Sequence, residues 1–222
     1  VDHLLDAGES GVILMFIEGL KTPSRIAAVA AKAADKGVPI VVMKVGRSEA
    51  GQRAAVSHTA HLTGADTAYD AVFERYGVIR VFDMEEMLAA AAAFARFPHG
   101  RVRRAAVVTT SGGAGAWAAD LCGTLGIDVP ELSAELQADI GEFIPEFGSP
   151  ANPVDVTAQA VEAGGVPLVR VLEKLQHSDE IDAMIVNMGL HKAGRINSLA
   201  ELLGPVYAQA NKPILFHSHI LP

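Results

Sequence analysis

The feature that most constrains this chain is a regular alternation of short apolar runs with longer helix-forming segments. The first run, 11–19 ("GVILMFIEG"), is apolar up to Glu18, which predicts a strand buried on both faces of a sheet. A helix-forming segment, 23–37, comes next, and Gly37 stops it before a second apolar run at 38–46. Strands that alternate with helices form βαβ units, whose parallel strands are joined by right-handed crossovers. We therefore expect an α/β protein built on parallel sheets.

The same alternation occurs twice along the chain. The two halves meet near 95–104 ("ARFPHGRVRR"), where Pro98 and Gly100 interrupt a helix. We predict two flavodoxin-like sandwiches in tandem, residues 1–99 and 100–222. The other predicted strands are 78–82, 104–110, 181–189 and 212–218; the other predicted helices are 65–77, 84–97, 116–126, 133–144 with Ser133 as N-cap, 167–176 and 198–210.

Composition narrows the class of protein. Hydrophobic residues make up 50% of the 222 positions and aromatic residues only 5%, as expected where small aliphatic side chains fill a parallel-sheet core. A net charge of −8 argues against a broad nucleic-acid-binding face. The single cysteine, Cys122, excludes an internal disulfide and a Cys-based zinc site and favours a reducing compartment, so we expect the cytoplasm. No apolar run reaches the roughly 18 residues of a membrane span.

The sequence also resembles a part of a longer protein. It opens on "VDHLLDAGES", which lacks an initial Met and resembles the last turns of a helix. We expect further domains in the complete protein.

Ligands of open parallel sheets bind beyond the carboxyl ends of the strands, so the residues that follow each strand are the candidates for chemistry. After the strand at 104–110 come Ser111, Gly112, Gly113, Ala114 and Gly115, predicted as a tight loop before a helix. Glycines let the backbone approach a ligand, and the start of a helix presents free N–H groups to an anion. The spacing matches neither the P-loop nor the dinucleotide fingerprint. The alternative is an ordinary tight turn that binds nothing.

A second candidate is the small-residue stretch 54–64 ("AAVSHTAHLTG"), which we expect to be a loop. It carries His58, which is suited to act as a base, a nucleophile or a ligand, or is a plain solvated histidine. His61 stands at i+3, but no third ligand lies in a recognisable relation, so we predict no metal site. Glu18, at the end of the first strand, either orients an imidazole or is a surface carboxylate.

Three segments together resemble the NDP-forming acyl-CoA synthetases, the ADP-forming acetyl-CoA synthetase relatives of succinyl-CoA synthetase. They are 44–81 ("KVGRSEAGQRAAVSHTAHLTGADTAYDAVFERYGVIRV"), 107–133 and 144–157 ("IPEFGSPANPVDVT"). The resemblance implies that His58 carries a phosphoryl group and that Glu18 positions its imidazole. It implies that residues 111–115 hold the phosphate from the neighbouring domain. Arg47, Ser57 and Thr59 are further candidates for phosphate contacts.

The chain departs from that family at two positions. Ala60 stands where the family has Gly, and His61 replaces a small residue, which puts the freedom of the segment in question. The resemblance also implies that CoA, ATP or another NTP, and Mg²⁺ serve the complete enzyme, with none tightly bound to this part. The CoA-binding Rossmann domain and the ATP-grasp domains are expected in the same polypeptide or on another subunit.

Other functions stay open at this stage. The same domains occur fused to an acetyltransferase in protein lysine acetyltransferases, as a regulatory module that binds CoA or an effector. A flavodoxin-like binding protein of unrelated function is the third alternative. The presence of both His58 and Glu18 favours the synthetase. The acyl substrate, the nucleotide base and any homo-oligomeric state are not readable from the sequence.

Overall fold

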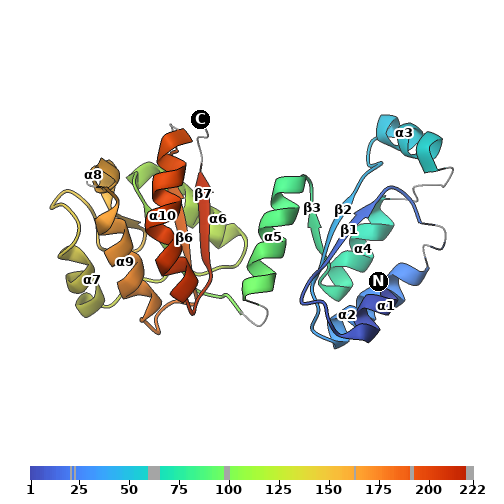
Figure 1. Cartoon of the computed structure of the whole chain (residues 1–222), viewed down its shortest axis with the longest axis horizontal. Helices are drawn as coiled ribbons and strands as arrows, with labels where there is room; N and C mark the ends of the chain where they lie inside the picture. The colour runs from blue at the N-terminus through green and yellow to red at the C-terminus, as the bar shows by residue number, and fades with distance from the viewer. Residues whose placement is uncertain are drawn as a thin grey trace. The chain divides into compact units, whose positions relative to one another are not determined.

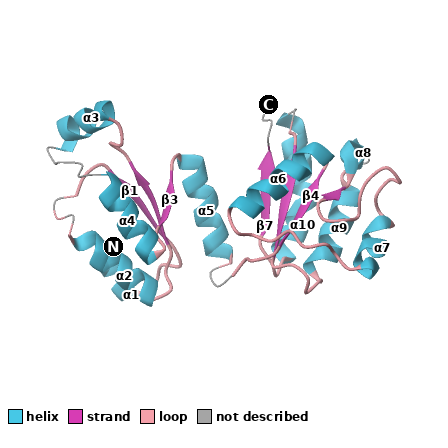
Figure 2. Cartoon of the chain, turned by 180° about the vertical axis from the view of Figure 1, so that it is seen from behind, coloured by secondary structure: helices cyan, strands magenta, loops and turns pink. Residues whose placement is uncertain are grey.

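A computed structural model describes the chain except for residues 21, 23, 60–65, 98–100, 163, 191–192 and 219–222, and describes only the backbone of 56–59, 161–162 and 193–195. The chain forms two compact units, Val1–His99 and Gly100–Pro222 (Figure 1). Each unit is a parallel sheet with helices packed on its faces (Figure 2). The predicted pair of parallel α/β units is confirmed.

The first unit has three strands in the order β1-β2-β3. Helices α2 and α4 lie on one face of this sheet, and α5 lies on the other (Figure 1). The elements are α1 (Asp2–Ala7), β1 (Ile13–Ile17), α2 (Arg25–Asp35), β2 (Ile40–Lys44), α3 (Glu49–Thr59), α4 (Asp66–Tyr76), β3 (Ile79–Val81) and α5 (Met84–Arg96).

Strand β1 corrects one prediction, because it is not buried on both faces. Leu14 and Phe16 are 42% and 51% exposed. Leu14 pairs with Val41 on the face that α5 covers, where Met87 of α5 packs against Val41 and Val81. One helix covers the middle of this face, so the edge strand keeps two large apolar side chains at the surface.

The second unit has four parallel strands in the order β5-β4-β6-β7. Strand β4 is buried along its whole length, as its continuous apolar run predicts. The elements are β4 (Ala105–Thr109), α6 (Gly112–Thr124), α7 (Ala134–Gly141), β5 (Val154–Asp155), α8 (Thr157–Glu162), α9 (Val166–Gln176), β6 (Ala183–Met188), α10 (Ala193–Gln209) and β7 (Ile214–Ser218). Helix α7 has the predicted cap, since Ser133 Oγ accepts from Leu136 N. The short helix α8 was not predicted.

A carboxylate fixes the amino end of this second sheet. Asp182, just before β6, accepts hydrogen bonds from Arg103 N at 3.0 Å, Arg104 N at 2.9 Å and the Arg104 guanidinium at 2.7 Å. The Arg104 side chain is the main cause that lowers the pKa of Asp182 to about 2. The entry of the chain into β4 is thereby tied to the start of its neighbour.

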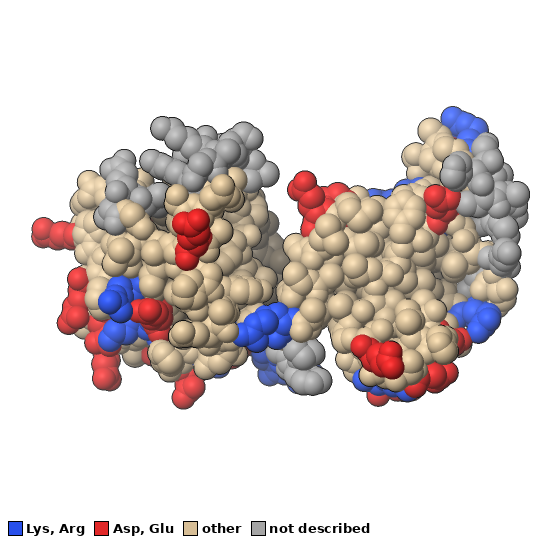
Figure 3. Space-filling model, in the orientation of Figure 1, with Lys and Arg blue, Asp and Glu red and all other residues tan. Residues whose placement is uncertain are grey.

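The distribution of charged side chains on the surface agrees with the expectation that the protein has no broad basic face. On the face drawn in Figure 3, the described Lys and Arg side chains are dispersed among Asp and Glu and form no basic stripe. None of the described helices combines the length and apolar composition needed to cross a membrane.

Candidate functional site

The His58 segment differs from the prediction, because most of it is helical. Residues predicted as a small-residue loop form α3, and His58 lies in the last turn of that helix. Ser48 starts the helix, since its Oγ accepts from Gly51 N at 3.1 Å and its carbonyl accepts from Gln52 N at 2.8 Å. Glu, Gln, Arg and Ala are good helix formers, so the segment that follows this cap propagates as a helix.

The pairing of the His58 imidazole with the Glu18 carboxylate stays a prediction. Glu18 lies directly after β1, at the carboxyl edge of the first sheet. The side chains of Ser57, His58 and Thr59 are not described, and Ala60 and His61 lie outside the described residues. The backbone does place the start of α3 at this same edge, because α3 follows β2.

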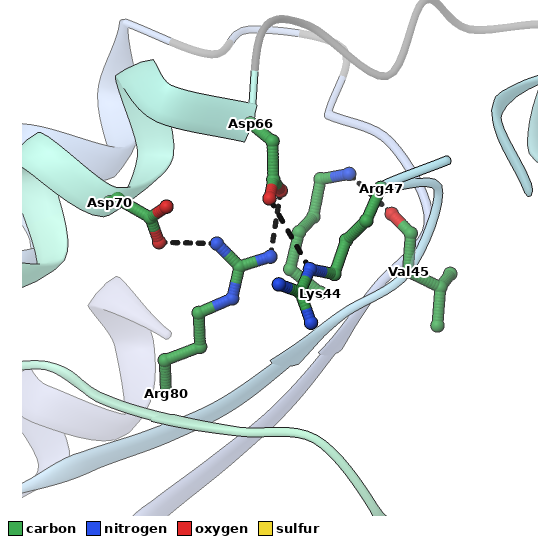
Figure 4. Close-up of polar contacts among 6 residues, drawn as sticks. All are labelled: Lys44, Val45, Arg47, Asp66, Asp70 and Arg80. Atoms are coloured by element: carbon green, nitrogen blue, oxygen red, sulfur yellow. Dashed lines mark hydrogen bonds and ion pairs between the residues drawn. The ribbon is translucent and has the colours of Figure 1, made fainter. Parts of the chain in front are cut away.

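A cluster of charged side chains, which we call the Asp66 cluster, lies at the same edge (Figure 4). Asp66, the first residue of α4, pairs with Arg80 of β3 (Nη2–Oδ1, 2.7 Å) and with Arg47 (Nε–Oδ2, 3.4 Å). Arg80 also bonds Asp70. Burial acts to raise the pKa of the Asp66 carboxyl, but the Arg80 hydrogen bond and the charges of Arg80 and Arg47 outweigh it and lower the pKa.

Lys44 lies at the base of the cluster and is only 3% exposed. Its ammonium donates to the Val45 carbonyl and stands 5.0 Å from the centre of the Tyr69 ring. Desolvation lowers the pKa of Lys44, and the charge of Asp66 offsets part of this effect. In the sequence, Lys44 stands near the end of the apolar run 38–46.

In the second unit, the predicted tight loop 111–115 is also mostly helix. Helix α6 begins at Gly112, and Ser111 is its N-cap residue. The buried Thr109 hydroxyl holds Ser111 in place, donating to its carbonyl at 3.0 Å and accepting from its N–H at 3.1 Å. Because Gly112, Gly113 and Ala114 occupy the first turn, their N–H groups have no intrahelical acceptor. The start of α6 therefore offers the donors of an anion site.

The glycines of this turn serve different purposes. A β-carbon on Gly115 would lie 2.8 Å from Thr109 Cγ2 and 3.2 Å from Pro153 Cβ, so Gly115 lets α6 pack closely on the sheet. A β-carbon on Gly113 would meet no atom of the described residues within 4 Å, so none of them crowds the first turn at this position. The sequence predicted backbone access, but only the structure separates the packing glycine from the open one.

Four residues that sequence reasoning missed also lie at this edge. Asn187, 1% exposed at the end of β6, donates to the Ala114 carbonyl at 2.9 Å, and its Oδ1 lies 3.4 Å from His217 Nδ1. Asp155 accepts from Thr157 N at 2.9 Å. Thr157 has a left-handed φ of 66°, and its buried hydroxyl has no hydrogen-bond partner among the residues that the structure describes. These four residues share one feature that could have identified them, because each stands at or just after the end of a strand.

The N–H groups at the start of α6 suit an anion such as a phosphoryl group, because they have no intrahelical acceptor and no described residue fills the space beside Gly113. The Asp155 carboxylate stands beside Gly112 at the same turn. Among the described residues, no group of three His, Cys, Asp or Glu side chains is arranged to hold a metal ion.

Comparison with known proteins assigns a family to each unit. Residues 1–94 match the family described as the succinyl-CoA ligase like flavodoxin domain, and residues 105–188 match the Ligase-CoA domain.

The relatives include two Pyrococcus furiosus proteins. The alpha subunit of ADP-forming acetate–CoA ligase II is 34% identical over 185 residues, covering 83% of this chain and 39% of the relative. The alpha subunit of ligase I is 37% identical over 160 residues, covering 72% of this chain and 34% of the relative. The chain thus spans less than half of the relatives it matches.

A solved structure supports the fold of both units. The dinucleotide-forming acetyl-coenzyme A synthetase 1 of Ca. Korarchaeum cryptofilum, in complex with phosphate and ADP, matches with a TM-score of 0.76 at 26% identity. The match covers 97% of this chain and 46% of that one. The two parallel-sheet units therefore have the succinyl-CoA synthetase-like fold, and the chain belongs to the NDP-forming acyl-CoA synthetase family.

Proposed function

We propose that this chain is the phosphoryl-carrying part of an NDP-forming acyl-CoA synthetase, which makes acyl-CoA, NDP and phosphate from an acid, CoA and NTP. The observation that carries the proposal is the start of α6, where N–H groups without an intrahelical acceptor lie beside space that no described residue fills, in a chain of this family. Such a site suits a phosphoryl dianion, which a chain that passes phosphate between partners must bind.

His58 is the proposed carrier. In the direction of NTP use, an imidazole nitrogen attacks the γ-phosphorus, a P–N bond forms, and the P–O bond to the leaving NDP breaks. In the next step an oxygen of the acid's carboxylate takes the phosphoryl group from His58 and gives an acyl phosphate. The CoA sulfur then attacks the acyl carbon, and phosphate leaves with the C–O bond electrons.

The other site residues support that carrier in distinct ways. Glu18 is proposed to accept a hydrogen bond from the second imidazole nitrogen, which sets the tautomer of the nucleophile. The N–H groups of the α6 first turn, at Gly112, Gly113 and Ala114, are proposed to stabilise the phosphoryl charge. Ser57 and Thr59 are proposed as hydroxyl contacts to the same group.

The remaining parts of the reaction are proposed to lie on other domains. CoA is assigned to a Rossmann domain, and NTP with Mg²⁺ to ATP-grasp domains, in the same polypeptide or on another subunit. The two Pyrococcus relatives are themselves alpha subunits, which supports such a division. Homo-oligomerisation and a cytoplasmic location belong to the same proposal. No observation favours the alternative of a regulatory acetyltransferase module.

The test is phosphorylation of the complete protein with γ-labelled ATP and Mg²⁺. We expect acid-labile, base-stable label on the wild type and on the control His177→Ala, which lies in the second unit, and none on His58→Ala. Glu18→Gln is expected to slow labelling about 10- to 100-fold, as losses of partners that orient a histidine do. Addition of acid and CoA is expected to discharge the label as acyl-CoA and phosphate. An unlabelled wild type, or equal label on His58→Ala, contradicts the proposal.

A further inference from the structure

The two flanks of the His58 segment meet at one carboxylate. The segment leaves the first sheet at the end of β2 and rejoins described structure at the start of α4. Arg47, three residues beyond β2, pairs with Asp66, the first residue of α4, at 3.4 Å (Figure 4). The ion pair therefore spans the base of the segment that contains His58.

The two cations on Asp66 hold it with different strength. The Arg80 side chain comes from β3, is 9% exposed, and reaches both Asp66 and Asp70 of α4. The Arg47 side chain is 54% exposed, and its guanidinium lies over the Phe82 ring at 4.6 Å. Arg80 thus anchors α4 to the sheet, whereas Arg47 ties the start of α3 to α4 through a contact open to solvent.

Asp66 also balances the charge of its surroundings. Lys44, Arg47 and Arg80 all interact with its carboxylate, and desolvation of Lys44 already disfavours the ammonium. Without Asp66 these cations would repel one another at the end of β2. The Asp66 carboxylate therefore offsets the repulsion among these cations near the start of α3.

We propose that Arg47 and Asp66 are positioning residues for His58: their ion pair sets the direction of α3 and so the place of the phosphoryl carrier. His58 lies about ten residues beyond Ser48, so its Cα is about 15 Å along the helix from the start. A tilt of about 5° at Arg47 moves His58 by roughly 1 Å, and a misplacement of that size costs about 100-fold in rate. The part that concerns phosphoryl transfer rests on the proposed function, whereas the link between α3 and α4 does not.

The experiment compares Arg47→Gln and Arg47→Lys with a matched control in the complete enzyme. The control is Arg170→Gln, because Arg170 is 56% exposed and pairs with Glu173 at 3.0 Å in the other unit. Hydrogen exchange is followed for the amides of α3, α4 and α6. The rate of His58 labelling from ATP, the KM for ATP and the rate of discharge by acid and CoA are measured on the same samples.

For Arg47→Gln we expect the α3 amides to exchange about 2- to 5-fold faster, as the loss of an exposed ion pair allows, with α4 and α6 unchanged. Labelling and discharge of His58 should both slow at least about tenfold with KM for ATP unchanged. Arg47→Lys should recover part of both effects, and Arg170→Gln should show neither.

Three results would overturn the proposal. Unchanged α3 exchange in Arg47→Gln would show that the ion pair does not hold the helix. Slow labelling without faster α3 exchange would make Arg47 a direct phosphate contact instead. An equal rise in α3 and α4 exchange would mean general destabilisation. A wild type without label on His58 defeats the proposed function, while the exchange comparison still decides the ion pair.

Discussion

At the carboxyl edge of the first sheet the flanking segments are held by ion pairs, whereas at that of the second they are held by backbone hydrogen bonds and close packing. In the first unit Asp66 joins Arg47 and Arg80. In the second, Thr109 and Asn187 bond the backbone around the start of α6. A half-exposed ion pair yields to small forces, while a buried neutral network does not. The first edge thus suits a segment that must be positioned, and the second suits a preformed cradle.

The second unit places its own strong ionic contact at the opposite end of the strands. Asp182 binds Arg104 and two backbone N–H groups at the amino edge, away from the start of α6. Its carboxyl edge holds the neutral groups of Thr109 and Asn187 and one carboxylate, that of Asp155, whose Oδ2 would lie 3.4 Å from a β-carbon on Gly112.

The largest effect should come from breaking the close packing in the second unit. Gly115→Ala is expected to destabilise that unit by about 2–3 kcal/mol, because its β-carbon would lie 2.8 Å from Thr109 Cγ2 against a buried strand. Urea denaturation followed by the fluorescence of Trp117, the single tryptophan, measures this in the 222-residue chain.

Gly113→Ala is the matched control for that substitution. No described atom lies within 4 Å of the added carbon, and Ala is a better helix former, so stability should rise by up to about 1 kcal/mol. Equal losses of stability in Gly115→Ala and Gly113→Ala would mean that close packing does not distinguish these glycines.

The next effect concerns the amino edge and depends on pH. Asp182→Asn should cost up to about 2 kcal/mol at pH 7, since a pKa of about 2 in the folded state lies below the ordinary 3.8. Because the folded pKa is the lower one, this stability is present above about pH 4 and is lost as the pH falls towards 2. The same denaturation at several pH values should show the wild type converging on the variant, and a constant difference would contradict the assignment.

The smallest effect tests whether the Asp66 cluster contains a destabilising charge. Lys44→Met should raise the stability of the first unit by about 1 kcal/mol, since it replaces a buried, desolvated ammonium by an apolar chain of similar size. The pKa of Lys44 is lowered on folding, so the wild type should gain stability as the pH rises towards 10.5 and the variant should not. Hydrogen exchange of the β2 amides measures both the gain in stability and its dependence on pH. Lys36→Met, at an exposed position, is the control and should not stabilise.

The sequence pattern predicted most of the helices and strands. It failed where contacts with neighbouring elements decide the structure. Strands β1, β2 and β4 follow from continuous apolar runs, because burial between helices leaves no polar face to read. The same rule overpredicted the burial of Leu14 and Phe16, since the number of helices on each face is a tertiary property. Residues 54–59 and 112–115 were expected to be loops because glycine and small residues are typical of turns. Both belong instead to helices, which follow Ser48 and Ser111.

The candidate site likewise has features that the sequence predicts and features that only the tertiary structure shows. The sequence by itself determined the two α/β units, the strand ends where chemistry belongs, and His58, Glu18 and the 111–115 motif as candidates, since these depend on local residue types and order. Only the tertiary structure brought Arg47, Asp66 and Arg80 together from three separate elements and placed Asn187 against the start of α6. Such contacts join residues 14 to 73 positions apart, and local sequence does not encode a meeting that depends on strand order and helix packing.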